Sequence, residues 1–205
     1  MNNNQITPKK ALNKALLKIK INHSDFDKFV RNFNQLLSQI NETESEEFHK
    51  NIIADFLKNT YYNPNHFINT KGGNDLVIHN GKDAKTSVGV ILEAKKPNTK
   101  LVGVNSNSPF DHKAFQELLL YFLRERITAK NLEIKHLIVT NIYQWFIFDG
   151  QIFDKLFAQN KDLVKQFTDF EAGILSIKTT NLFYQEIAQP AIESVKNQLT
   201  FTYFD

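Results

Sequence analysis

The sequence predicts an α/β fold in which a central mixed β-sheet is flanked by helices. Residues 9–58 repeat apolar side chains at three- and four-residue intervals, which is typical of amphipathic helices. Short apolar runs between residues 74 and 149 then follow the order ββαββ around one helical segment. Helical spacing resumes after residue 150, so we expect helices on both sides of a single sheet.

The composition indicates one globular domain of ordinary size. The chain has 205 residues, of which 41% are hydrophobic, enough to bury a core. A net charge of +3 is compatible with a nucleic-acid partner without requiring one. The absence of cysteine excludes disulfides, thiolate zinc sites and cysteine nucleophiles. No apolar run of about 18 residues and no secretion signal occurs, so we expect a cytoplasmic location without membrane contact.

Helices are expected in the N-terminal part of the chain and again near its end. Ser24 is the expected N-cap of the second helix, and Thr43-x-x-Glu46 forms a capping-box pattern for the third. Asp111 is the expected cap of the helix inside the sheet region. The predicted helices cover residues 9–21, 25–40, 43–58, 112–128, 151–158, 161–171 and 181–197.

Four strands are expected, at residues 74–80, 87–94, 136–140 and 144–149. The first two flank Asn80-Gly81, a turn signal. Tyr143, Trp145 and Phe146 near the last strand are interpreted as core residues rather than as a base-stacking platform. The expected organisation is a helical extension (1–40), a core (41–178), and a C-terminal helix that begins a connector to further domains (179–205).

The residues that carry chemistry lie on the first two predicted strands. Asp75 stands near the start of one apolar run, and Glu93-Ala94-Lys95 closes the next. Glu93 and Lys95 are two residues apart, so on a strand they share one face, whereas Ala94 faces the opposite side. If the strands are neighbours, Asp75 lies beside Glu93.

Two carboxylates that lie close together repel each other unless a cation separates them. Mg²⁺, with Mn²⁺ as a substitute, is the expected partner of Asp75 and Glu93, because hard divalent cations prefer oxygen ligands. Such an ion binds a phosphate oxygen and a water together. Lys95 would orient that water or stabilise charge on the phosphate. A structural interpretation stays open, in which Glu93 and Lys95 are a solvated strand end and Asp75 is a turn residue.

This pattern resembles the signature of the PD-(D/E)XK nuclease superfamily, although Asn74 stands where a proline often precedes the first acid. The stretch from Asn41 to Pro190 also resembles the N-terminal nuclease domain of type IIG restriction-modification enzymes. The matching segments include DLVIHNGKDAK, GVILEAKKPN, AFQELLLYFLRERI and HLIVTNIYQWFIFD. The resemblance implies a restriction-endonuclease-like fold and a type II site-specific deoxyribonuclease that acts in antiphage defence.

The resemblance implies two further site residues. A glutamate on the helix before the first catalytic strand reaches the metal site in related nucleases, and Glu46 fits best, with Glu47 close behind. Gln116 resembles a residue that completes the site, although Tyr121 follows it at five positions rather than the four of the family motif. The alternatives are that both glutamates favour a helix N-terminus and that Gln116 is an exposed helix residue.

Lys96, Lys113 and Arg124 are the candidates for binding the DNA backbone, with Lys100 and Arg126 nearby. A solvated charged face is the alternative for each of them. Arg124 also lies near a helix C-terminus, where a cation is favourable in any case.

The resemblance implies double-stranded DNA as substrate and transient pairing of two copies on it, because one chain holds one active site. It also implies methyltransferase and target-recognition domains, in the same or a partner chain, with S-adenosylmethionine bound only there. Two other functions stay open. One is a non-catalytic nucleic-acid-binding or assembly module that keeps the fold, and the other is an enzyme acting on RNA or branched DNA.

Overall fold

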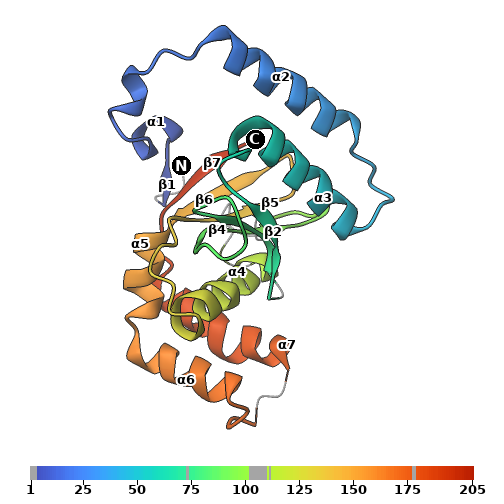
Figure 1. The fold of residues 1–205 in the computed structure, drawn as a ribbon. Helices are drawn as coiled ribbons and strands as arrows, with labels where there is room; N and C mark the ends of the chain where they lie inside the picture. Colours follow the sequence, from blue (N-terminus) through green and yellow to red (C-terminus); the bar gives the residue numbers. More distant parts are fainter. Residues whose placement is uncertain (1–3, 73, 102–109, 111, 177–178) are drawn as a thin grey trace.

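A computed structural model describes residues 4–72, 74–101, 110, 112–176 and 179–205. The described residues form an α/β fold around a mixed seven-stranded sheet, which confirms the predicted class (Figure 1). The strand order is β1-β7-β6-β5-β4-β3-β2. The strands are β1 (Gln5–Ile6), β2 (Ile68–Lys71), β3 (Asn74–His79), β4 (Val88–Ala94), β5 (His136–Thr140), β6 (Trp145–Asp149) and β7 (Phe201–Phe204).

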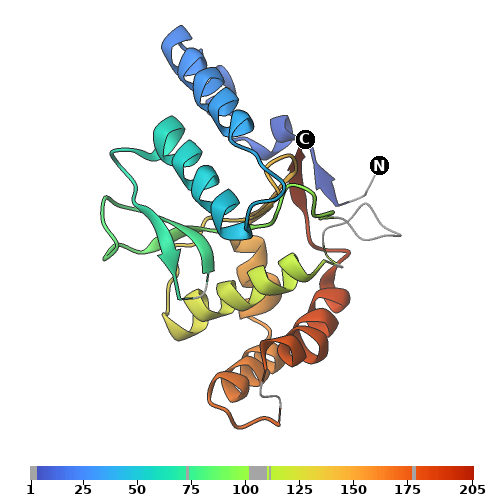
Figure 2. The same cartoon turned by 90° about the vertical axis from the view of Figure 1, so that its right-hand side faces the viewer.

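Helices cover both faces of this sheet (Figure 2). The longer ones are α2 (His23–Ser38), α3 (Glu46–Leu57), α4 (Lys113–Leu123) and α6 (Lys161–Glu171). Short α-helices are α1 (Pro8–Ala11), α5 (Gly150–Phe153), α7 (Thr180–Phe183) and α8 (Gln189–Val195). A 3₁₀ turn, η1, spans Leu16–Lys18, and π-helical turns are η2 (Lys58–Tyr62), η4 (Arg124–Thr128), η5 (Asp154–Ala158) and η6 (Tyr184–Ala188).

Strand β4 is buried along its whole length, and from Val90 onward, after an irregularity of the register next to Val88, its side chains alternate between two hydrophobic cores. Val88 and Ile91 belong to the core shared with α4 and the C-terminal helices. Val90, Leu92 and Ala94 belong to the core beneath α2 and α3. Because side chains on a strand alternate between the two faces, Glu93 and Lys95 are directed to the α4 side.

The directions of the strands bring the ends of several central strands to the same end of the sheet. Strands β4 and β5 are parallel, with Glu93 opposite Val139 and Ala94 opposite Thr140. Strand β3 is antiparallel to β4, and Leu76 lies opposite Leu92. The C-terminal end of β4, the start of β3 and the turn that follows β5 therefore lie at the same end of the sheet, where these strands begin or terminate.

The four predicted strands are confirmed, whereas β1, β2 and β7 were not predicted. Residues 201–204 were assigned to the start of a connector, but they pair with β6 as strand β7. They carry three aromatic side chains, and Phe201 packs against Phe146 and Phe148. Residues 5–6 and 68–71 are short or polar, so apolar periodicity gives no signal for them. The predicted boundaries at residues 40 and 178 stay a prediction.

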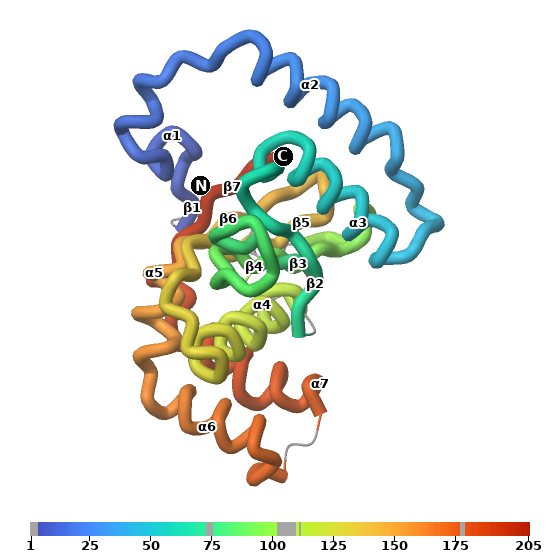
Figure 3. The backbone as a smooth tube through the Cα atoms, in the orientation of Figure 1, coloured from blue at the N-terminus to red at the C-terminus, as the bar shows by residue number. Residues whose placement is uncertain are grey.

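The predicted helix at residues 9–21 is wrong. Only α1 and η1 are helical there, and the side chains of residues 9–27 are exposed. An isolated helix of this length is marginal unless its apolar face packs against other elements. Figure 3 shows this segment arching away from the sheet before α2 returns the chain to α3.

Two predicted helix caps are also corrected. Asn22, not Ser24, caps α2, because its side-chain oxygen accepts from the backbone N–H of Asp25 at 2.8 Å. Ser45, not Thr43, caps α3, because the Thr43 hydroxyl donates to Asn41 instead. The predicted cap Asp111 lies outside the described residues, and His112 caps α4 through its Nδ1 atom. In the part of the chain that the structure describes, the helices are too short or too polar to cross a membrane.

Replacement of Phe153 by alanine is expected to destabilise the fold strongly. Phe153 is 0% exposed, and its ring contacts the rings of Phe115, Phe122, Phe148 and Phe157. The lost burial and the resulting cavity should lower the free energy of unfolding by about 3–5 kcal/mol, measured by urea denaturation. Phe26→Ala is the matched control, because Phe26 is 55% exposed, and its effect should stay within about 0.5 kcal/mol. Equal effects of the two substitutions would contradict this packing.

Candidate functional site

The site is built on the end of β4. Glu93 is 1% exposed although it is ionisable, and Lys95 follows two residues later on the same side. The backbone N–H of Lys95 donates to the carbonyl of Thr140 at 2.8 Å, which extends the pairing of β4 with β5 beyond Ala94. The backbone that carries both side chains is therefore fixed by the sheet.

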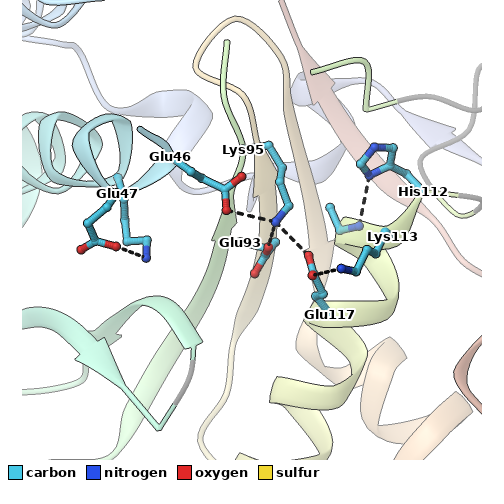
Figure 4. Close-up of polar contacts among 9 residues, drawn as sticks. Glu46, Glu47, Glu93, Lys95, His112, Lys113 and Glu117 are labelled. Atoms are coloured by element: carbon cyan, nitrogen blue, oxygen red, sulfur yellow. Dashed lines mark hydrogen bonds and ion pairs between the residues drawn. The ribbon is translucent and has the colours of Figure 1, made fainter. Parts of the chain in front are cut away.

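The Lys95 ammonium lies among three carboxylates from three different elements (Figure 4). Its Nζ atom is 2.5 Å from Glu93 Oε1 on β4 and 2.8 Å from Glu117 Oε2 on α4. It is also 3.4 Å from Glu46 Oε1 on α3. We call these four residues the β4-edge cluster, because they meet at the point where strand β4 ends: Glu46, Glu93, Lys95 and Glu117.

Charges within the β4-edge cluster shift the pKa values of its members. Burial acts to lower the pKa of Lys95, but the carboxylates of Glu93 and Glu117 outweigh it and hold that pKa well above its ordinary value. Burial acts to raise the pKa of Glu117, yet hydrogen bonds with Glu93 and Lys95 hold it below its ordinary value. Lys95 is therefore protonated and Glu117 ionised at neutral pH.

Helix α3 contributes Glu46 and not Glu47. Glu46 is the first residue of the helix, and the Ser45 cap fixes the point at which the helix begins. The Glu47 carboxylate pairs with Lys50 at 2.5 Å instead. Consecutive helix residues point about 100° apart, so only one of the two can face the sheet edge. The structure thus brings Glu46, the preferred residue of the pair, to Lys95.

Helix α4 contributes Glu117, which sequence reasoning did not identify. Gln116, the predicted residue, donates from Nε2 to Gln189 Oε1 at 2.6 Å and does not join the β4-edge cluster. Glu117 follows Ala114 and precedes Leu120 at intervals of three residues, and both of these are fully buried. An acidic residue in line with these apolar residues, near the start of a mostly apolar helix, can be recognised in the sequence alone.

Asp75 lies on β3 next to the cluster by register. Leu76 pairs with Leu92 in the antiparallel ladder, so the same register places the backbone of Asp75 opposite that of Glu93. The prediction that the two acids stand on neighbouring strands therefore holds for the backbone. The Asp75 side chain is outside the described part of the structure.

Two further side chains adjoin the β4-edge cluster. Burial, and then the charge of Lys95, lower the pKa of His112. Burial raises the pKa of Tyr184, and the charges of Glu117 and Glu93 raise it further. The tyrosine of this region is thus Tyr184 from η6, whereas Tyr121 packs against the hydrophobic core.

The three predicted DNA-binding residues lie at different places. Lys113 is at the start of α4, with its Nζ 3.4 Å from Glu117 Oε1 and 5.7 Å from the centre of the Tyr184 ring. Lys96 is partly exposed directly after Lys95. Arg124 lies beyond the other end of α4 and pairs with Glu171 at 2.9 Å. Lys96 and Lys113 therefore flank the β4-edge cluster, and Arg124 does not.

The carboxylates of the cluster converge on the Lys95 ammonium. Among the described side chains, which leave out that of Asp75, no three acids or histidines are arranged to hold a metal. The point around which the carboxylate oxygens of Glu46, Glu93 and Glu117 lie is occupied by the Lys95 Nζ atom, although carboxylate oxygen is the type of ligand that Mg²⁺ prefers. A fourth carboxylate, that of Asp75, is carried by the adjacent strand.

The chain belongs to the DUF7149 family, which is described as a domain of unknown function and whose model matches residues 6–205. No curated protein and no solved structure matches the chain. The matched range contains the whole β4-edge cluster and Asp75. Since the family description names no activity, the geometry of the site is the basis for a functional assignment.

Replacement of Glu117 by glutamine should make stability less dependent on pH. A carboxyl whose pKa is depressed in the folded state adds stability above its unfolded pKa, near 4.3, and this stability is lost as pH falls through the folded pKa. Glu117→Gln should therefore cost about 1–3 kcal/mol at pH 7 and distinctly less at pH 3, measured by urea denaturation.

Glu193→Gln is the control for this experiment, because Glu193 pairs with Lys196 on an exposed helix surface. It should change stability by less than about 0.5 kcal/mol at either pH. A deficit for Glu117→Gln that is equal at pH 7 and pH 3 would show that its ionised form contributes nothing.

Proposed function

We propose that this chain is a Mg²⁺-dependent DNA endonuclease domain with a PD-(D/E)XK fold. The observation that carries the proposal is the convergence of Glu93, Lys95 and Glu46 at the edge of the sheet where β4 ends, with Asp75 opposite Glu93 by register. A cation site at this edge fits phosphodiester hydrolysis, which needs carboxylates, a positive group and an exposed rim.

The order of elements supports the finer fold. A helix (α3) precedes the acid-bearing hairpin β3–β4, and a helix (α4) follows it before β5 pairs in parallel with β4. The helix before the hairpin and the helix after it both place a carboxylate at Lys95. This agrees with the nuclease pattern suggested by the sequence of residues 75–95.

Each residue has a distinct role in the proposed reaction. Asp75 and Glu93 would hold Mg²⁺, which would neutralise charge at the phosphate and activate a water for attack. Lys95 acts as a hydrogen-bond donor and a fixed positive charge rather than as a base, because its surrounding carboxylates keep it protonated. Glu46 and Glu117 hold the Lys95 ammonium from two helices. Lys96 and Lys113, on the rim, contact backbone phosphates.

The wider setting proposed here is a type IIG restriction-modification enzyme. Double-stranded DNA is then the substrate, and two copies pair transiently on it to cut both strands. Methyltransferase and target-recognition domains, in the same or a partner chain, bind S-adenosylmethionine and select the site. The resemblance of residues 41–190 to nuclease domains of this class supports this setting.

The test of catalysis is plasmid cleavage with Mg²⁺. Asp75→Asn, Glu93→Gln and Lys95→Met should each lower the cleavage rate by about 100-fold or more, because each removes a group that stabilises the transition state. Removal of the metal with EDTA should abolish cleavage, and Mn²⁺ should restore it. Glu47→Gln is the control, since Glu47 pairs with Lys50 and not with Lys95, and it should cut within about twofold of wild type. Unimpaired cleavage by the three variants would disprove the assignment.

Metal binding separates this function from a non-catalytic module that keeps the fold. Calorimetry with Mn²⁺ should show binding by the wild-type chain that is lost in Glu93→Gln and kept in Glu47→Gln. A wild-type chain that binds DNA but no Mn²⁺, and cuts nothing, would identify the β4-edge cluster as a structural ion-pair network.

A further inference from the structure

The turn between β5 and β6, residues 141–144, has a strained backbone. Ile142 has φ +77°, in the left-handed region that favours glycine. A β-branched residue is rare there because its Cβ crowds the neighbouring carbonyl oxygen. Backbone strain of this kind persists only where the surrounding structure imposes it, and it concentrates at functional sites.

Several hydrogen bonds impose this conformation. Gln144 N donates to Asn141 Oδ1 at 2.7 Å, and Ile142 N donates to Thr140 Oγ1 at 3.0 Å. The indole Nε1 of Trp145 donates to the carbonyl of Ile142 at 2.7 Å. These bonds close the turn from both sides, so its backbone is rigid.

The strained turn places one side chain inside and the next one outside. Ile142 is 2% exposed and belongs to the core beneath α3. Tyr143 is 48% exposed, and its ring contacts no other aromatic ring among the described residues. The interpretation of Tyr143 as a core residue is therefore wrong, whereas Phe146 is buried as expected. The turn thus carries an exposed aromatic side chain.

This turn adjoins the β4-edge cluster. Thr140, immediately before it, accepts the backbone N–H of Lys95. Asn141 Nδ2 donates to the carbonyl of Thr99 at 2.8 Å, which ties the turn to the segment that follows Lys95. Figure 4 shows the β5–β6 hairpin running beside the strand end that carries Lys95.

We propose that Tyr143 binds the DNA substrate through its aromatic ring, against a base or sugar next to the phosphate that is cut. This inference rests on the proposed function. An aromatic ring stacks on any nucleotide, so the contact would add affinity without adding sequence specificity. Because hydrogen bonds already hold the backbone of the turn and a tyrosine side chain has only two χ angles, little conformational entropy is lost when the ring is covered.

The test measures the Kd for duplex DNA by fluorescence anisotropy, with Ca²⁺ in place of Mg²⁺ so that the DNA is not cut. Tyr143→Leu should weaken binding by about tenfold, within the range known for loss of a base–aromatic stack. Tyr143→Phe keeps the ring and should bind within about twofold of wild type. The slope of log Kd against log salt should not change in either variant, because no charge is removed.

Tyr61→Leu is the matched control, because Tyr61 is also an exposed tyrosine but lies in η2, beyond the opposite end of α3 from Glu46. It should bind DNA within about twofold of wild type. Equal binding by Tyr143→Leu and wild type would overturn the inference while the nuclease assignment stands. Equal losses in Tyr143→Phe and Tyr143→Leu would also overturn it, since they would indicate a hydroxyl contact. If the wild-type chain binds no DNA, the result contradicts the proposed function as well as this inference.

Discussion

A single ammonium group connects three parts of the chain that are distant in sequence. Lys95 Nζ meets carboxylates from β4, α3 and α4. Those of Glu93 and Glu117 are 1% and 12% exposed and would be costly to bury alone, whereas that of Glu46 is 41% exposed. Glu93 is the most buried of them, and its distance to the Lys95 Nζ atom, 2.5 Å, is the shortest of the three. The positions at which α3 and α4 begin are constrained by the same contacts, because Glu46 and Glu117 lie in the first or second turn of their helices.

The sheet makes this arrangement possible. The body of β4 lies between two apolar cores and has no room for an unpaired charge, so its polar residues are confined to its C-terminal end. The parallel neighbour β5 ends at the same edge and is followed by the strained turn at Ile142. Hydrogen-bonded strand backbone thus borders the cluster on one side, and the first turns of α3 and α4 border it on the other. A rigid frame of this kind suits groups that must hold fixed positions.

Much of the fold could be predicted because its central strands are long apolar runs bounded by turn residues. The predicted strands at 74–80, 87–94, 136–140 and 144–149 all occur, with small changes at their ends. Strand β7 was missed because its pairing with β6 depends on a contact across more than fifty residues. The helix at 9–21 was wrong because periodicity indicates which face is apolar but not whether a partner surface exists.

The sequence by itself determined that Glu93 and Lys95 share one face of a strand, since the two-residue period of a strand is local geometry. It also located Asp75 on the neighbouring strand. Only the tertiary structure decided that Glu117 rather than Gln116 reaches Lys95. The rotation of α4 about its axis is set by packing of its apolar face on the sheet, and one residue changes the direction of a helical side chain by about 100°. Non-local packing, which no local pattern encodes, made that choice.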